Sequence, residues 1–487
     1  MRKQDLYKLV SSLSAVERKV FKEKYAAKSE GNFMRLFDAI AGGEATDDEE
    51  VREKFKSENF VNHLHKTKAY LYEALLETLL NPLQSNFIRL QILKKLEFAE
   101  VLLSRKMIEQ AEEQLLEAYA MAVENGEVEL ELLLCNELSV IQIHIHKSQI
   151  HIEKLYGAHS KMEEYLAHNK LYVSLIDAYS KRGKPGAVPV EQLANDPLFT
   201  SKAEPESIKA RRIKEVCRSL IYTVQKEYEL ALKSNYKILS LTTGLEQLSP
   251  LREIGCINAI FNICHTRQSQ KLAFDEEMKM LEDFKPYSLW GKSHRFICLS
   301  RIKLLEKLGK EKVTDSAQLV EWTINGIKEN EPFLSEVDLV KIWFSLASLL
   351  LKEKRYDHAL DFLYKINNSK EAKEKRTIIY RGTQLYQLIA YYEMGDLDRL
   401  SGMLRNYKYY QKKDDSFYLI EKEVAGFLTK AMSIADKKEK QLLKDDFARN
   451  LYENHATHLR SGLAYLENIS WIKAPVEIDT GNNMAKL

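Results

Sequence analysis

The chain has little of the two residues that most often interrupt regular secondary structure. Its 487 residues include 18 glycines and 9 prolines, whereas average usage is about 7% and 5%. Because glycine and proline make most tight turns and end most helices, their scarcity argues against many short, turn-linked strands. No stretch sustains the polar–apolar alternation of a half-buried strand. We therefore predict an all-α protein of long helices.

Long hydrophobic runs are absent as well. No run approaches the ~18–20 apolar residues of a membrane-spanning helix. The first residues, MRKQDLYKLVSSLSAVERKVF, contain no unbroken apolar stretch of about 7–15 residues, as a secretory signal would. We expect a cytoplasmic protein that does not insert into a membrane.

Cysteine is scarce, and its spacing fits neither a disulfide framework nor a zinc site. The five cysteines include no C-x-x-C pair, and all lie in apolar helical contexts: Cys135, Cys217, Cys256, Cys264 and Cys298. An odd number of thiols in such contexts favours buried, reduced side chains. This prediction suits a reducing cytosol.

Recognisable catalytic and ligand-binding motifs are also missing. The sequence contains no G-x-x-x-x-G-K-[ST] or G-x-G-x-x-G loop, no G-x-S-x-G elbow and no H-E-x-x-H motif. The densest histidine group is His144, His146 and His151. His144 and His151 would lie about 10 Å apart along a helix, too far to share one zinc ion without intervening ligands. We predict no catalytic, cofactor or metal site, and therefore a protein that is not an enzyme.

Neither sign of charge is in excess. The chain has 73 Lys and Arg against 71 Asp and Glu, a formal net charge of +2. This balance provides no overall field that would attract nucleic acid or an anionic membrane, although local patches can still form.

What the sequence does contain is a clear pair of amphipathic helices at 343–366, WFSLASLLLKEKRYDHALDFLYKI. The apolar positions of the first helix are Trp343, Leu346, Ala347 and Leu350, and those of the second are Tyr356, Ala359, Leu360 and Leu363. Both sets have helical spacing, and the small alanines would let the two helices approach closely. One such pair cannot bury its apolar face alone, so it predicts neighbouring pairs in a stacked array. An array also explains a length beyond the roughly 250–300 residues of a single-core domain.

Composition and the positions of helix-ending residues divide the chain into five predicted segments. Short, unequal helices predict an N-terminal helical cap over 1–82, with a capping box at Ser14 and Glu17 and a helix end at Asn81-Pro82. Helix pairs follow over 83–180 and 208–467, with a C-terminal tail over 468–487. The connection at 181–207 carries four of the nine prolines, which predicts an irregular boundary or hinge.

The 343–366 pair resembles a tetratricopeptide repeat. The matching residues are Trp343, Leu346, Ala347, Leu350, Tyr356, Ala359, Leu363 and Ile366. The segments 98–118, 222–239 and 384–404 match in part, and Ala359 and Leu400 occupy equivalent positions 41 residues apart. The N-terminal stretches LSAVERKVF, NFMRLFDAI and FVNHLHKTKAYLYE are similar to large helical proteins of Bacteroidetes-type bacteria. The repeat resemblance implies a right-handed solenoid of antiparallel helix pairs whose concave face holds a peptide or protein.

We therefore predict a non-catalytic scaffold or adaptor that binds a protein or peptide partner in a superhelical groove, without a cofactor. In related folds the first helices line the concave face. The candidate groove residues are those that lie off the packing stripe: Lys341, Ser345, Gln384 and Gln387. The 25 tyrosines also favour a protein interface, where an apolar ring with a polar tip is useful.

The alternative is a nucleic-acid-linked regulator or an accessory factor of a nucleoprotein machine. It would use the stretch RNYKYYQKK at 405–413, with Arg405, Tyr407, Lys408 and Tyr410, or the helix that carries Lys66 and Lys68. Cations interleaved with aromatic rings can contact phosphates and stack on bases. The competing interpretation of 405–413 is a helix end whose cations face the C-terminal dipole and whose tyrosines cover the core.

Overall fold

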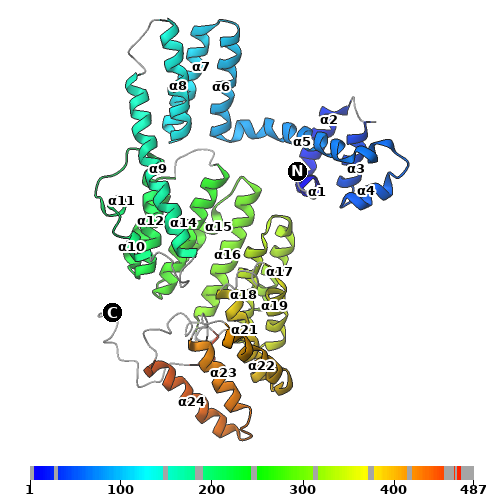
Figure 1. Cartoon of the computed structure of the whole chain (residues 1–487), viewed down its shortest axis with the longest axis vertical. Coiled ribbons are helices and arrows are strands. Elements are labelled where there is room, and N and C mark those ends of the chain that lie inside the picture. The colour runs from blue at the N-terminus through cyan, green and yellow to red at the C-terminus, as the bar shows by residue number, and fades with distance from the viewer. Residues whose placement is uncertain are drawn as a thin grey trace. The chain divides into compact units, whose positions relative to one another are not determined.

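The computed structural model describes residues 5–26, 31–145, 152–180, 190–242, 249–310, 316–370, 378–413, 419–454, 466 and 469–472. These residues form helices joined by turns and contain no strand, which confirms the all-α prediction (Figure 1). Contacts divide the chain into two compact units. One comprises Met1–Tyr179, Pro189–Gln225 and Lys237–Glu253, and the other comprises Ser180–Val188, Lys226–Tyr236 and Ile254–Leu487.

The first unit begins with a small helical core of its own. Its helices are α1 (Asp5–Ser12), α2 (Ala15–Lys24), α3 (Asn32–Ala41), α4 (Asp48–Lys54), the 3₁₀ turn η2 (Asn59–His63) and α5 (Leu64–Asn86). The predicted capping box starts α2: the Ser14 hydroxyl accepts the Glu17 N–H at 3.3 Å, and the Glu17 carboxylate accepts the Ser14 N–H at 2.7 Å. The helix end expected at Asn81-Pro82 is wrong, because α5 continues to Asn86. A proline inside a helix removes one backbone hydrogen bond, at a cost of about 3 kcal/mol, and need not end the helix.

The rest of the first unit pairs longer helices around small residues. Its helices are α6 (Ile88–Ser104), α7 (Ile108–Glu124), α8 (Val128–Ile145), α9 (Ile152–Ser180), α10 (Val190–Leu193), α11 (Pro197–Thr200) and α12 (Ile208–Gln225), and α13 (Tyr228–Ser240) is shared with the second unit. Ala99 of α6 faces Ala111 and Ala118 of α7, all fully buried, and this lets the two helices pack closely. The proline-rich connection forms α10 and α11, one turn each, in its described part.

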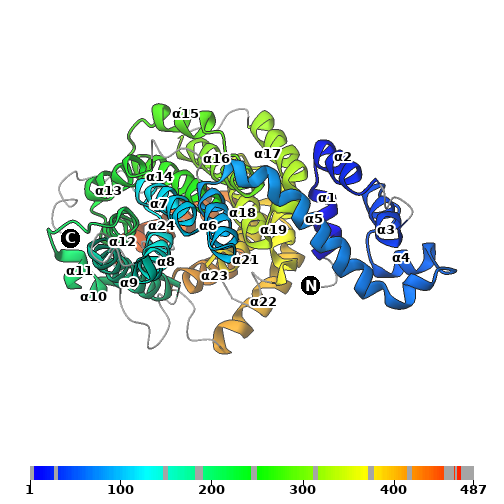
Figure 2. The same cartoon turned by 90° about the horizontal axis from the view of Figure 1, so that it is seen from above.

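The second unit is a succession of longer helices. They are α14 (Pro250–Ser269), whose first turn belongs to the first unit, α15 (Asp275–Asp283), α16 (Leu289–Gly309), α17 (Ala317–Asn330), α18 (Glu336–Lys352), α19 (Tyr356–Asn368), α21 (Ile378–Met394), α22 (Leu397–Lys413), α23 (Leu419–Ala431) and α24 (Lys437–Asn454). Helices α16, α18, α21 and α23 pack each against the next, while α17, α19 and α22 pack beside their own neighbours in sequence. Figures 1 and 2 show α14, α16 and α18 following one another in both views. We call α14, α16, α18 and α21 the first helices.

The 343–366 pair forms α18 and α19 and packs as its apolar pattern predicts. Leu346, Ala347, Ala359 and Leu363 are completely buried. They belong to a core that runs from α16 to α24 and includes Trp471 near the C-terminus. The Trp471 indole donates to the Glu393 carboxylate at 2.7 Å, so the segment expected to be a tail begins inside this core. Residues 473–487 lie outside the described residues.

The turn inside several helix pairs has one recurrent geometry. Lys106, Lys271 and Lys354 adopt positive φ, at 59°, 59° and 61°. The next N–H then donates to the carbonyl five residues back: Met107 to Leu102 at 3.0 Å, Leu272 to Arg267 at 2.9 Å and Arg355 to Leu350 at 2.9 Å. This is the hydrogen bond of a Schellman helix end, where glycine is usual. The same bond follows Gly126 and Gly395, so the chain repeats the turn with either residue.

All five cysteines are buried and free, and their burial agrees with the prediction from their apolar sequence contexts. Within the described part of the chain, no helix is both long enough and apolar enough to cross a membrane.

Candidate functional site

One side of the first helices collects polar and aromatic side chains in the second unit. These residues, called the polar face below, are Asn258, Phe261 and His265 on α14, Trp290, His294, Cys298 and Arg301 on α16, and Asp338, Lys341 and Ser345 on α18. Within each helix they are spaced by three, four or seven residues, the spacing that places side chains on one side. The opposite sides of these helices supply the core.

Side-chain contacts connect α14 to α16 across this face. His294 Nε2 lies 2.8 Å from Asn258 Oδ1. The Arg301 guanidinium lies over the Phe261 ring, 4.9 Å from its centroid, and the same ring stacks on His265 with centroids 6.1 Å apart. A cation over an aromatic face is attracted to the ring quadrupole, by about 0.5–2 kcal/mol.

Arg301 is the unusual member of the polar face. Its guanidinium is only partly exposed and makes no hydrogen bond or ion pair with any residue that the structure describes. Desolvation lowers the pKa of Arg301, opposed by Cys298 and by the carboxylate of Asp338, yet the group stays charged at any physiological pH. Five N–H donors are therefore held beside an aromatic ring without a protein acceptor.

The two histidines of the polar face are neutral at pH 7. His265 has an accessible ring, and its pKa is lowered by partial desolvation and by the nearby Arg301 cation. Desolvation also lowers the pKa of His294, although Asp338 partly opposes it. The permanent cations on this face are therefore Arg301 and Lys341.

Cys298 and His294 are residue types that can act as nucleophile and base, but their geometry and burial do not suit catalysis. Cys298 Sγ lies 3.7 Å from His294 Nε2, but that same nitrogen also faces Asn258. Burial of Cys298, which is 2% exposed, raises the pKa of its thiol to about 12. A catalytic cysteine needs a lowered pKa and an accessible thiolate, and this pair provides neither.

The four predicted groove residues differ in position and in exposure. Lys341 and Ser345 lie on the polar face: Lys341 Nζ is 3.8 Å from Asp338 Oδ1, and the Ser345 hydroxyl donates to the Lys341 carbonyl at 3.1 Å. Gln384 is partly exposed and donates to Asn367 Oδ1 at 2.7 Å. Gln387 is 1% exposed and accepts from Asn367 Nδ2 at 2.7 Å. Gln387 therefore belongs to the interior, because the end of α19 covers it.

In the basic aromatic stretch on α22, one described candidate residue is exposed and another is buried. Arg405 is exposed, but Tyr407 is 7% exposed and packs into the hydrophobic core, so its ring is not available to stack on a base. The side chains of Lys408 and Tyr410 lie outside the described residues. Of the two lysines at the start of α5, Lys66 is exposed, whereas Lys68 is buried in an ion pair with Asp48. His144, His146 and His151 have no described side chains.

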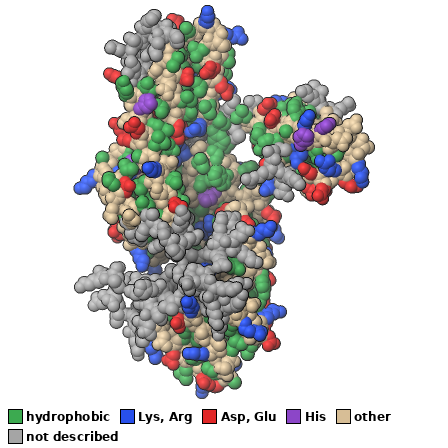
Figure 3. Space-filling view, in the orientation of Figure 1, with side chains coloured by type: hydrophobic (Ala, Val, Ile, Leu, Met, Phe, Trp, Pro, Cys, Tyr) green, Lys and Arg blue, Asp and Glu red, His purple; other side chains and the backbone are tan. Residues whose placement is uncertain are grey.

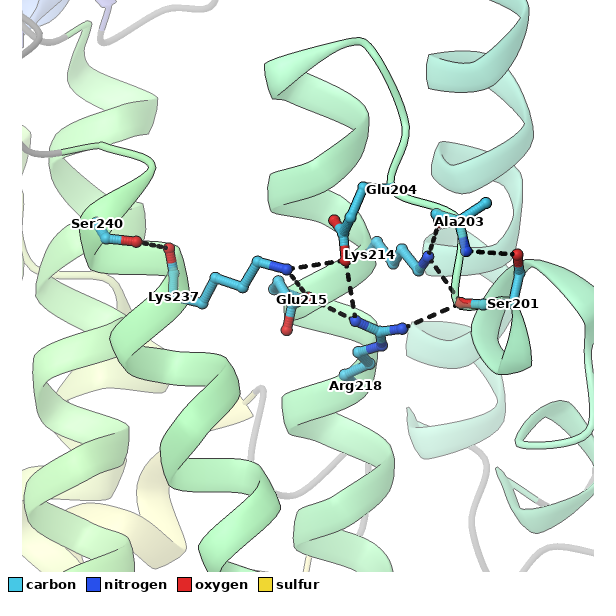
Figure 4. A network of polar contacts seen from close by, with 8 residues as sticks. All are labelled: Ser201, Ala203, Glu204, Lys214, Glu215, Arg218, Lys237 and Ser240. Atoms are coloured by element: carbon cyan, nitrogen blue, oxygen red, sulfur yellow. Dashed lines mark hydrogen bonds and ion pairs between the residues drawn. The ribbon is translucent and has the colours of Figure 1, made fainter.

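The first unit contains a dense cluster of charged side chains that form hydrogen bonds and ion pairs with one another and with nearby backbone carbonyls (Figure 4). The Lys214 ammonium, on a side chain 2% exposed, donates to the carbonyls of Ser201 at 3.0 Å and Ala203. Arg218 contacts Glu215 at 2.7 Å and the Ser201 carbonyl at 3.3 Å. These bonds fix residues 201–206 to α12, and burial lowers the pKa of Lys214. This arrangement is a structural clamp.

Sequence reasoning missed the α14 and α16 members of the polar face. The available signal was the spacing of Asn258, Phe261 and His265 on one helix, and of His294, Cys298 and Arg301 on the next. Each set has helical period, but only the folded chain shows that the two sets meet. Among the described residues, no group of three or more His, Cys, Asp or Glu is placed to hold a metal ion. On the side shown in Figure 3, cationic and anionic side chains are interspersed, in line with the balanced net charge.

No protein-family model matches the chain, and neither the curated proteins nor the solved structures contain a match.

Proposed function

We propose that the chain is a non-catalytic scaffold or adaptor that binds a protein or peptide partner on the polar face. In this proposal the helix pairs form a right-handed, tetratricopeptide-like solenoid, and the polar face lies along its groove. The recurrent helix-end turn and the packing of α16 on α18 and of α18 on α21 support a repeat origin. The buried free thiols favour a location in the cytoplasm.

The observation that carries the proposal is the unsatisfied guanidinium of Arg301 within a continuous face of polar side chains. A partly desolvated charge without a partner is unfavourable, and the penalty is removed when a ligand supplies an acceptor. Arginine and tryptophan are also the residues that most often dominate protein interfaces. Trp290, on the same side of α16, is 53% exposed.

The proposal is tested by site-specific photo-crosslinking in the native host. A photoreactive amino acid at Ser345, on the polar face, should crosslink one protein reproducibly and in near-stoichiometric yield. The same amino acid at Leu442, an exposed position on α24, is the matched control and should not crosslink that protein. Recovery of the uncrosslinked chain alone from Ser345, across varied growth conditions, would contradict the proposal.

The nucleic-acid alternative has less support, because Tyr407 and Lys68 are buried. Among the described side chains at 405–407 and at the start of α5, the exposed cations are Arg405 and Lys66. A mobility-shift assay distinguishes the two functions, since nucleic-acid binding weakens steeply as salt is raised. The scaffold proposal predicts no shift with DNA or RNA even at low salt.

A further inference from the structure

The polar face has two distinct anchor positions on a single helix, Trp290 and Arg301 of α16. They are 11 residues apart, which places them within about 20° of each other around the helix and roughly 16 Å apart along it. The Trp290 indole is 53% exposed, and the Arg301 guanidinium has no acceptor among the described residues. One anchor therefore offers apolar surface, and the other offers an unpaired cation.

We propose that this face binds an extended segment of a partner protein that carries an acidic side chain for Arg301 and an apolar side chain for Trp290. This inference rests on the proposed function and specifies the partner. An extended chain advances about 3.3 Å per residue, so the two side chains should be about five residues apart. A guanidinium fork matches a carboxylate with two parallel hydrogen bonds, which makes Asp or Glu the fitting group.

The residues between the anchors favour an extended segment over a helix. An extended backbone brings unpaired N–H and C=O groups that need partners, whereas a helix satisfies its own. The polar face supplies such partners beside α16: the exposed amide of Asn258, the His265 imidazole and the Ser345 hydroxyl. A groove for a helix would instead present a continuous apolar stripe.

Two other charges on the face are consistent with this assignment. Lys341 adds a second cation on α18, and the only anion on the face, Asp338, lies 3.8 Å from it. Asp338 also interacts electrostatically with Arg301 without forming an ion pair. An incoming carboxylate would therefore meet one cation that is already paired and one, Arg301, that is free.

The experiment selects short random displayed peptides on the immobilised full-length chain and on three variants. Arg301→Gln removes the free cation, Trp290→Ala removes the apolar anchor, and Lys292→Gln removes an exposed cation from the opposite side of α16. Peptides from the wild type and from Lys292→Gln should share an Asp or Glu about five residues from an apolar residue. Arg301→Gln should lose the acidic preference, with affinity for wild-type peptides falling about tenfold or more. Trp290→Ala should lose the apolar preference alone.

A matched peptide pair sharpens this test. Replacing the selected Glu by Gln should weaken binding to the wild type but not to Arg301→Gln, because the two changes remove the same contact. If the selected peptides lack acidic residues but bind more weakly to a fourth variant, Lys341→Glu, than to the wild type, the inference is overturned and the proposed function stands. If no peptide is selected, or if peptides bind the wild type, Arg301→Gln, Trp290→Ala and Lys341→Glu equally, both are overturned.

Discussion

Gly326 lies within α17 at a point where any side chain would collide with α16. A Cβ atom on Gly326 would be 2.1 Å from Cε2 and 2.7 Å from Cζ of Phe296. The ring has little room to move, since Phe296 is 9% exposed and lies against Trp322 with centroids 5.7 Å apart. The missing side chain is therefore what allows α16 and α17 to pack at this distance.

The substitution Gly326→Ala has two opposing effects on the free energy of unfolding. Overpacking a core position costs about 1–3 kcal/mol. Alanine in a helix interior is favoured over glycine by roughly 0.5–1 kcal/mol. Because the contact would be far shorter than the ~3.5 Å optimum between carbon atoms, the steric cost lies at the upper end of its range. We expect a net destabilisation of about 2 kcal/mol.

Tryptophan fluorescence measures this effect selectively. The four tryptophans, Trp290, Trp322, Trp343 and Trp471, all belong to the second unit, so urea unfolding followed by their emission reports on that unit. Gly326→Ala should lower the midpoint without changing the slope. The control is Gly402→Ala in α22, where a Cβ would meet nothing within 4 Å. That variant should gain roughly 0.5–1 kcal/mol.

Two results would refute the steric argument. One is a midpoint for Gly326→Ala at or above that of the wild type. The other comes from a double-mutant cycle with Phe296→Leu, which makes room for the new methyl group. The double variant should be more stable than the sum of the single effects predicts, because the clash is shared. Strict additivity would show that the Phe296 ring is not the obstacle.

Three further predictions concern other contacts. Burial alone would raise the pKa of Asp48, but hydrogen bonds from Lys68 and Tyr7 lower it. The N-terminal core should therefore lose stability as pH falls below about 4. Asp48→Asn should make stability less dependent on pH, as measured by acid unfolding followed by circular dichroism. Lys354→Gly relieves a positive φ of 61° and should stabilise the second unit by about 1 kcal/mol in urea, whereas a loss would contradict the turn argument. Lys214→Met leaves the carbonyls of the clamp unpaired and should cost about 1–3 kcal/mol, visible as faster proteolysis near residue 203; unchanged cleavage would contradict the clamp.

The elements that could be predicted from the sequence are those with local causes. The capping box at Ser14 needs residues only three apart, and the α18–α19 packing follows from apolar periodicity that includes Ala347 and Ala359. Both are present in the structure. The helix-end turns also had a local signal, a lysine at the break between helices such as Lys106 or Lys354, which we did not use because glycine is the usual residue there.

The features that could not be predicted depend on residues distant in sequence. Gln387 lies three residues from the partly exposed Gln384, but the end of α19 covers Gln387 through Asn367. Tyr407 sits in a basic stretch and yet packs into the core. The contact of His294 with Asn258 joins residues 36 apart. Helical periodicity places a residue on one side of its helix, and only the neighbouring helix decides whether that side is buried.

The core residues of helix α16 and the residues that we propose for binding lie on different sides of the helix. Phe296 and Leu299 are buried, whereas Trp290 and Arg301 lie on the other side, where no described residue makes a hydrogen bond with the guanidinium. Removing Arg301 loses its contact with the Phe261 ring but leaves no described buried donor or acceptor unsatisfied, so Arg301→Gln should alter peptide affinity and lower the free energy of unfolding by no more than about 1 kcal/mol. Gly326→Ala should do the reverse: it should lower the free energy of unfolding and leave peptide affinity unchanged, provided that binding is measured under conditions in which the variant is folded. If Arg301→Gln instead destabilised the unit as much as Gly326→Ala, the guanidinium would be a structural group, and the argument for a partner carboxylate at this position would fail.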